Sequence, residues 1–192
     1  ERGWLGISLP ERYGGTGGSV TEQTVLFEES GRTLTPGPLL TSSVLAAQIV
    51  LNAGNDAQKS ALIPGVITGE VILTLAKGER LETASGDGRL TISGDGFFVP
   101  YAASAAHGIG APRPAIGAWP DTTLVLVDPQ ADGVTMTAME SIANNPQFLV
   151  DFDDVPLPND SVLGEIAGGK TALDLAAQRA TVVQCAETLG RA

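Results

Sequence analysis

The hydrophobic pattern of this 192-residue chain changes its period near Val71, and this change limits the folds that the sequence can adopt. Upstream, apolar and small residues recur at helical spacing, as between Phe27 and Gly31. Downstream, short apolar runs such as 71–76 and 122–127 are separated by turn residues, which is typical of strands. The sequence therefore predicts helices first and strands second, rather than strands that alternate with helices.

The helical part is divided by residues that stop helices. The segment 34–38 contains two prolines and a glycine, and Gly54 is a suitable residue for a helix C-terminus. Pro64 is expected to disturb the last helix of this part. Three helices are expected, beginning at Ser19 or Thr21, spanning about 39–53, and beginning at Asn55 or Asp56.

The following part is predicted to hold short strands and one long loop. Residues 89–93 and 97–99 flank the sequence Gly-Asp-Gly at 94–96, which is a hairpin signal. The stretch 102–120 is rich in Ala, Gly and Pro and is expected to be a loop. Further strands are expected at 134–137 and 148–152. This spacing favours an antiparallel sheet or barrel.

Helical spacing returns after Gly168 and Gly169, so the predicted class is α+β. We expect a partial N-terminal helical domain over 1–69, a β middle domain over 70–166 and the first helix of a C-terminal helical domain over 167–192. An isolated helix of this size is marginal without packing, so its apolar stripe is expected to meet the middle domain, another subunit or a further segment. The stripe consists of Ala172, Leu173, Ala176, Ala180, Val183 and Ala186.

Composition argues against several functional classes. A formal net charge of −11, with only 11 basic residues, disfavours nucleic-acid binding. No apolar run approaches the ~20 residues that a membrane-spanning helix needs. The single cysteine, Cys185, forms no internal disulfide, which favours a reducing cytoplasm. With one histidine, His107, expected to be incidental in the loop, we predict neither a zinc site nor a Cys–His dyad.

Four segments, in chain order, resemble acyl-CoA dehydrogenases. The first has the pattern Gly-Trp…Pro-Glu-x-Tyr-Gly-Gly and is followed by a helix that contains Glu-Glu-Ser-Gly-Arg. The third has Phe-Asp-Asp-Val-Pro before Leu-Gly. The segments lie at 3–15 with 28–32, at 58–70, at 150–165, and at 177–190.

The resemblance implies an oligomeric FAD-dependent enzyme that oxidises an acyl-CoA thioester to its 2,3-enoyl product. In such enzymes a carboxylate removes the α-proton while the flavin accepts the β-hydride. In most branches this carboxylate lies on a later helix. In others it precedes the arginine of the first C-terminal helix, where this chain has Gln178. No catalytic residue is therefore expected in this chain. Arg179, which matches the family arginine, is implied to bind acyl-CoA, and a solvated helix arginine is the alternative explanation.

The resemblance also implies where the flavin lies. Lys77 and Gly78 fall in the segment that corresponds to a family Thr-Glu-Pro run, with Gly78 at the threonine position. Phe98 and Pro100 fall in an aromatic-Ile-Thr run, so that Phe98 is implied to stack beside the flavin and Pro100 replaces a second threonine. Phe97 and Phe98 are explained equally well as strand residues, one of them in the core. If the groove is intact, Gly78→Thr and Pro100→Thr are expected to tighten flavin binding.

The sequence is compatible with three functions. The chain is an acyl-CoA dehydrogenase with unusual flavin contacts, a degenerate subunit that pairs with an active homologue, or a binding module that has kept only the fold. A yellow colour in the protein purified alone favours the first, and colour gained only on co-expression favours the second. Absence of flavin and CoA binding in both settings leaves the third.

Overall fold

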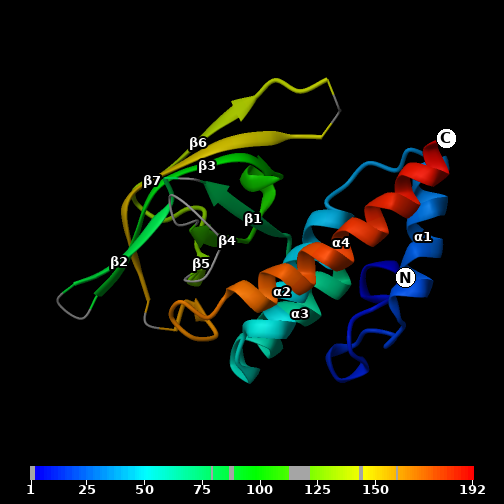
Figure 1. Cartoon of the computed structure of the whole chain (residues 1–192), viewed down its shortest axis with the longest axis horizontal. Coiled ribbons are helices and arrows are strands. Elements are labelled where there is room, and N and C mark those ends of the chain that lie inside the picture. Colours follow the sequence, from blue (N-terminus) through cyan, green and yellow to red (C-terminus); the bar gives the residue numbers. More distant parts are fainter. Residues whose placement is uncertain (1–2, 79, 87–88, 113–121, 143–144, 159) are drawn as a thin grey trace.

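The computed structural model describes residues 3–78, 80–86, 89–112, 122–142, 145–158 and 160–192. A layer of helices lies beside two four-stranded sheets (Figure 1). The helical segments are η1 (Trp4–Gly6), η2 (Glu11–Tyr13), α1 (Val20–Arg32), the π-helical η3 (Leu39–Ala46), α2 (Ala47–Ala53), α3 (Asp56–Thr68), η4 (Ala102–Ser104) and α4 (Lys170–Arg191). The strands are β1 (Leu73–Gly78), β2 (Glu82–Gly86), β3 (Arg89–Pro100), β4 (His107–Pro112), β5 (Leu124–Val127), β6 (Val134–Met139), β7 (Gln147–Leu157) and β8 (Val162–Leu163). The predicted α+β class is confirmed.

The helix starts follow from side chains that satisfy free backbone N–H groups. Ser19 caps α1 and Asn55 caps α3, and in both helices the residue three positions later completes a capping box. Gly69 ends α3 in a left-handed conformation, as a glycine C-cap does. The expected disturbance at Pro64 is wrong, because α3 continues through this residue to Thr68.

The two sheets have the orders β1-β4-β5-β8 and β2-β3-β7-β6 and do not close into a barrel. The prediction of antiparallel pairing fails at one place, since β1 and β4 are parallel. A parallel pair needs a long crossover, and here the chain between β1 and β4 passes through β2, β3 and η4. All other strand pairs among the described residues are antiparallel.

The expected hairpin at 94–96 is wrong, because β3 runs unbroken across it. Gly94 instead lies at a register shift and has a φ of 104°, so the Gly-Asp-Gly sequence marks a bulge. The turn lies between β2 and β3, where Gly86 is opposite Arg89. The sequence pattern missed β2.

The long loop expected over 102–120 is wrong for its first part, which forms η4 and β4, while 113–121 lie outside the described residues. Gly108, Gly110 and Ala111 give β4 little apolar side-chain volume, so it shows no strand periodicity in the sequence. A side chain at Gly110 would come within 2.6 Å of Ile92 Cδ1, which shows how closely the two sheets approach there. The small residues of this stretch thus allow close packing of the two sheets and do not indicate a loop.

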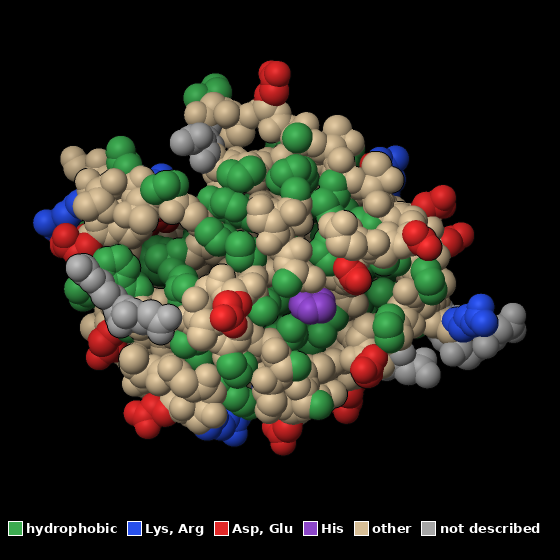
Figure 2. All heavy atoms as spheres, turned by 180° about the vertical axis from the view of Figure 1, so that it is seen from behind, with side chains coloured by type: hydrophobic (Ala, Val, Ile, Leu, Met, Phe, Trp, Pro, Cys, Tyr) green, Lys and Arg blue, Asp and Glu red, His purple; other side chains and the backbone are tan. Residues whose placement is uncertain are grey.

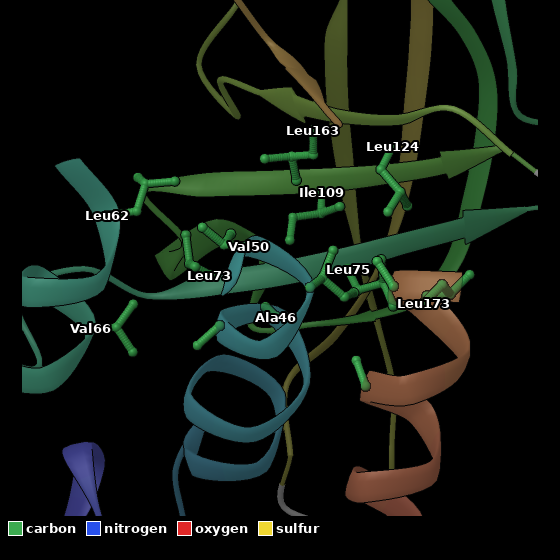
Figure 3. Packing of buried hydrophobic residues seen from close by; sticks show 14 of the residues in the cluster. Ala46, Val50, Leu62, Val66, Leu73, Leu75, Ile109, Leu124, Leu163 and Leu173 are labelled. Atoms are coloured by element: carbon green, nitrogen blue, oxygen red, sulfur yellow. The ribbon is translucent and has the colours of Figure 1, made fainter. Parts of the chain in front are cut away.

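The main core lies between the helices and the first sheet. In Figure 3, Leu73, Leu75 and Ile109 of the sheet face Val50 and neighbouring helical side chains, and all of these residues are buried. The Leu73 N–H donates a hydrogen bond of 3.0 Å to Ser42 Oγ, which fixes the start of β1 against η3. A second apolar cluster fills the space between the two sheets.

The apolar stripe of α4 contacts α1, η3 and α2, which the sequence did not predict. Its first residues, Ala172, Leu173 and Ala176, also share the main core with strand residues such as Leu75, so the expected contact with the middle domain is confirmed for this part of the stripe.

Gln23 of α1 contacts Arg179 of α4, and Gly31 contacts Glu187. The two residues of each pair are 156 positions apart in the sequence. Because this offset is the same along both helices, α1 and α4 run parallel. Because this contact joins the first and last segments, the division into domains at 69 and 166 stays a prediction.

Glycines set the distance between these two helices. A Cβ on Gly31 would lie 2.1 Å from the Glu187 carbonyl oxygen, and a Cβ on Gly190 would lie 1.9 Å from that of Glu28. The backbones therefore approach more closely than any larger residue allows. In the part of the chain that the structure describes, no helix has the length and apolar character to cross a membrane.

Candidate functional site

A bulge in β3 gives one part of the sheet surface an unusual backbone. Gly96 is opposite Val150 and Val99 is opposite Phe148, so two residues of β3 occupy the space of one residue of β7. The two bulged residues are Phe97, which is 45% exposed, and Phe98, which is 67% exposed. Phe98 has a φ of 53°, a left-handed conformation that is strained for any residue except glycine. A large aromatic side chain is thus held outward at a position that disfavours it.

Contacts on both sides hold the bulge in place. Val99 is 1% exposed and anchors the strand in the core between the sheets. The Thr74 hydroxyl donates a hydrogen bond of 2.5 Å to the Pro100 carbonyl oxygen. The Tyr101 N–H donates one of 3.0 Å to the Pro146 carbonyl oxygen, and Tyr101 also has a positive φ of 56°. Strain of this kind persists only where its surroundings fix it, and it is concentrated at functional sites.

The end of β1 lies against the same strand. Thr74 meets Pro100, whereas a Cβ on Gly78 would lie 1.7 Å from the Asp95 carbonyl oxygen. The two strands therefore pass each other in opposite directions, although they belong to different sheets. Gly78 has no room for a side chain, while Lys77 beside it is exposed.

Arg80, which follows β1, forms an ion pair with Asp95 of β3. Arg80 Nη2 lies 2.9 Å from Asp95 Oδ2, and the Asp95 side chain is 9% exposed while that of Arg80 is 76% exposed. A buried carboxylate requires a charged or hydrogen-bonding partner, which Arg80 supplies from the surface. Arg80 thus has a structural role.

The bulge and the end of β1 form a surface with two exposed aromatic side chains, one exposed ammonium group and several backbone polar groups. Such a surface suits a planar aromatic ligand with anionic substituents. Among the described residues, no group of three or more His, Cys, Asp or Glu side chains is arranged to hold a metal ion.

The structure brings four of the five predicted site residues, Lys77, Gly78, Phe98 and Pro100, onto two adjacent strands. Their assignment to a cofactor stays a prediction. The sequence pattern missed Thr74 and the ion-paired role of Asp95. An Asp between two glycines within an apolar strand was the available signal for the second.

Arg179 lies apart from these residues, in the helical layer. Its Nε donates a hydrogen bond of 2.9 Å to Gln23 Oε1, and Gln23 is 2% exposed. Burial lowers the pKa of Arg179 below its ordinary value, because the charged form loses solvation. Gln178, at the position of a family base, is exposed on the same helix. The predicted acyl-CoA contact of Arg179 stays a prediction.

His107 is the first residue of β4 rather than a loop residue. It lines a groove between α3 and the end of β7, together with Gln58 and Asp128. Figure 2 shows its side chain in purple on the face opposite to that of Figure 1, surrounded largely by hydrophobic and neutral atoms. Cys185 is exposed on α4.

The comparisons with known proteins agree with this fold. Residues 1–70 match the family model described as acyl-CoA dehydrogenase, N-terminal domain. The chain is 30% identical over 179 residues to acyl-CoA dehydrogenase FadE12 of Mycobacterium tuberculosis, a match that covers 84% of this chain and 46% of that protein. The chain therefore spans about half the length of this curated relative.

Two solved structures have the same fold at lower identity. The ChsE4–ChsE5 complex from Mycobacterium tuberculosis matches with a TM-score of 0.85 and 23% identity, over 98% of this chain and 51% of that one. An acyl-CoA dehydrogenase complexed with FAD from Bacillus anthracis matches with a TM-score of 0.84 and 20% identity, over 98% of this chain and 35% of that one. At these identities the matches support the fold of this chain.

Proposed function

This chain belongs to the acyl-CoA dehydrogenase family, and from this premise we propose that it binds FAD at the β3 bulge and contributes to the oxidation of an acyl-CoA to its 2,3-enoyl-CoA. The relative named above carries the same activity in its name, and one structural neighbour is described as complexed with FAD. Both facts support the proposal without identifying the acyl group.

The observation that carries the proposal is the exposed Phe98. A side chain of this size gains nothing by facing solvent, and its left-handed φ adds a cost of about 1–2 kcal/mol. A flat aromatic ligand that covers the ring would offset this cost by burying the same surface. The isoalloxazine ring of FAD is such a ligand.

The residues of the bulge fit FAD in part. Phe98 offers aromatic surface, and Lys77 offers a positive charge near which phosphate oxygens are favoured. Pro100 offers no N–H, and its carbonyl oxygen already accepts the Thr74 hydroxyl. Gly78 has no side chain and offers only its backbone N–H and C=O groups to a ligand. Phe98 and Lys77 would therefore hold the cofactor, which when bound supplies the acceptor for the hydride of the acyl group.

The two expected restoring substitutions, Gly78→Thr and Pro100→Thr, differ in the space that the structure leaves for them. A threonine at position 78 collides with the Asp95 backbone, so Gly78→Thr will not strengthen binding. Pro100 is half-buried and lies just after the bulge, so Pro100→Thr stays the substitution expected to tighten binding.

Flavin affinity, measured by quenching of FAD fluorescence with the complete chain, tests the proposal. Phe98→Ala is expected to weaken FAD binding about tenfold, which is the effect of about 1.4 kcal/mol of lost contact. Phe97→Ala, which removes the neighbouring and less exposed ring, is the matched control and is expected to have a smaller effect. Equal affinities of the wild type and Phe98→Ala would overturn the assignment of FAD to the bulge.

A second candidate function follows from Gln178 and Gly78. An amide at the position of a family base accepts no proton, and Gly78 presents no hydroxyl to a flavin. These features favour a degenerate subunit that pairs with an active homologue. FAD retained only after co-expression with such a homologue, and not by the chain alone, would favour this function over the first.

A further inference from the structure

The bulge of β3 contains more residues than the part of β1 that lies alongside it. Thr74 of β1 holds Pro100 through a hydrogen bond of 2.5 Å, and a Cβ on Gly96 would lie 3.1 Å from the Ala76 Cβ. Between these two contacts β1 advances by two residues, about 7 Å, whereas β3 advances by four, about 13 Å if extended. The surplus residues leave the line of the sheet as the bulge, which presents Phe98 to solvent.

The Thr74 contact is made between two strained residues of β3 and its end. Phe98 has a φ of 53° and Tyr101 a φ of 56°, and Pro100 lies between them in the chain. A residue other than glycine lowers its energy by turning from a left-handed to a negative φ, and such a turn would reorient the Pro100 carbonyl group. The hydrogen bond from the Thr74 hydroxyl opposes this movement, because its acceptor must stay within about 3 Å of the donor.

Packing alone does not explain the hydroxyl group of Thr74. The residue is 2% exposed and lies between the two sheets, beside Ala76, Val99 and Ala102. Valine would fill the same space in these apolar surroundings without a polar atom to satisfy. A buried hydroxyl needs a hydrogen-bond partner, and here the partner is a carbonyl oxygen next to the bulge. The polar atom therefore serves the conformation of the bulge.

We infer that Thr74 is a positioning residue for FAD. Through the Pro100 carbonyl group, its hydroxyl holds the bulge in the conformation that presents Phe98 to the cofactor. The inference rests on the proposed function, because the bulge is the proposed FAD site. Thr74 is buried beneath the bulge and acts through Phe98 without touching the cofactor.

Two substitutions separate the hydroxyl from the shape of the side chain. Thr74→Val keeps the shape and removes the hydroxyl, whereas Thr74→Ser keeps the hydroxyl and removes a methyl group. With the complete chain and quenching of FAD fluorescence, Thr74→Val is expected to weaken FAD binding about tenfold, and Thr74→Ser to stay within about twofold of the wild type. A residue that served only packing would give the reverse order, because serine leaves a small cavity. That reverse order, or equal affinities of all three proteins, overturns the inference.

A double-mutant cycle with Phe98→Ala distinguishes failure of this inference from failure of the proposed function. If Thr74 acts through Phe98, Thr74→Val has no further effect on FAD affinity once Phe98 is replaced by alanine. The same tenfold loss in both backgrounds, about the loss expected from Phe98→Ala itself, contradicts action through Phe98. Wild-type affinity in Phe98→Ala removes the proposed function, and the inference with it. A weakened Phe98→Ala beside an unchanged Thr74→Val removes the inference alone.

A milder variant and a matched control complete the test. Thr74→Cys replaces the hydroxyl by a weaker donor and applies if Thr74→Val fails to fold; it is expected to bind FAD more weakly than the wild type. Ser42→Ala removes another buried hydroxyl that bonds to the backbone of this region, the acceptor of the Leu73 N–H. It is expected to lower the urea midpoint and leave FAD affinity unchanged. Wild-type affinity in Thr74→Cys, or an equal loss of affinity in Ser42→Ala, also overturns the inference.

Discussion

The α1–α4 contact and the β3 bulge both depend on unusual backbone geometry, but in opposite ways. The helices meet where side chains are absent, since Gly31 and Gly190 let one backbone touch the other. The bulge carries a large side chain, Phe98, where the backbone conformation favours glycine. In the first region the residue relieves a steric conflict, and in the second it creates one.

This difference indicates that the glycines of the helices serve stability, whereas Phe98 serves binding. A residue chosen for stability is the residue that its packing requires, as at Gly31, where a Cβ would meet the Glu187 carbonyl oxygen. A residue retained where the backbone conformation favours glycine, as at Phe98, needs a reason outside the folded chain, and a bound ligand is such a reason. The variants below test whether the two regions respond with opposite signs.

The largest expected effect is in the helical layer. Gly31→Val and Gly190→Val each place a Cβ about 2 Å from a carbonyl oxygen of the facing helix, so the helices must separate. We expect a loss of about 3–5 kcal/mol in the free energy of unfolding, or failure to fold. Urea unfolding measures this loss. Gly108→Ala is the control, since its Cβ would have no neighbour closer than 3.9 Å, and a comparable loss there would contradict the steric explanation.

A smaller loss of stability is expected at Gly78. This residue lies close to the bulge, but, as in the two helices, the facing backbone leaves no room for a side chain. Gly78→Thr puts an atom 1.7 Å from the Asp95 carbonyl oxygen and should cost about 2–4 kcal/mol. Thermal unfolding and FAD titration of the same sample separate stability from binding. Tighter FAD binding by a stable Gly78→Thr protein would show that β1 and β3 can move apart.

Phe98→Gly provides the sharpest contrast, because stability and binding are expected to change in opposite directions. Relief of the left-handed strain, about 1–2 kcal/mol, exceeds the backbone entropy cost of glycine, about 0.5–1 kcal/mol. The variant should therefore be slightly more stable in urea and bind FAD more weakly. Phe97→Gly, whose φ is not positive, should lose stability. A destabilised Phe98→Gly would mean that the ring packs for structural reasons.

The smallest expected effect concerns a surface charge at the start of α1. The Ser19 hydroxyl and two backbone N–H groups donate hydrogen bonds to Glu22, and they hold the pKa of its carboxyl below its ordinary value. A lowered pKa in the folded state adds stability above the unfolded pKa, and this stability is lost as the pH falls through the folded value. The urea midpoint of Glu22→Gln should therefore fall less than that of the wild type between about pH 5 and pH 3. Parallel curves would contradict this role of Glu22.

The sequence predicted the helical part and the fold class because local signals dominate there. Ser19 and Asn55 are hydrogen-bonding caps that act within three residues, and Gly69 ends a helix through its own φ. The resemblance to acyl-CoA dehydrogenases supplied the functional class, which composition and spacing alone did not. The helix caps can be predicted without knowing any contact between residues that are distant in the sequence.

The β part was harder to predict because its critical residues act through distant neighbours. Gly94 was interpreted as a turn residue, but it is a bulge glycine whose Cβ would lie 1.9 Å from the Arg80 carbonyl oxygen. The strand at 107–112 was interpreted as a loop, because its glycines and alanine fit between two sheets that the sequence does not display. The exposure of Phe98 likewise depends on a register shift against β7.

The parallel contact between α1 and α4 also sets the order in which the protein can mature. Arg179 lies 156 residues after its partner Gln23, so α1 leaves the ribosome long before the helix that covers it exists. At synthesis rates of about 5–20 residues per second, this interval lasts roughly 10–30 s. During it, Phe27 and the surface around Gly31 lack the cover that α4 provides in the finished protein. The nascent chain thus has a period of exposed apolar surface in which a chaperone can bind, and it ends only when α4 is synthesised.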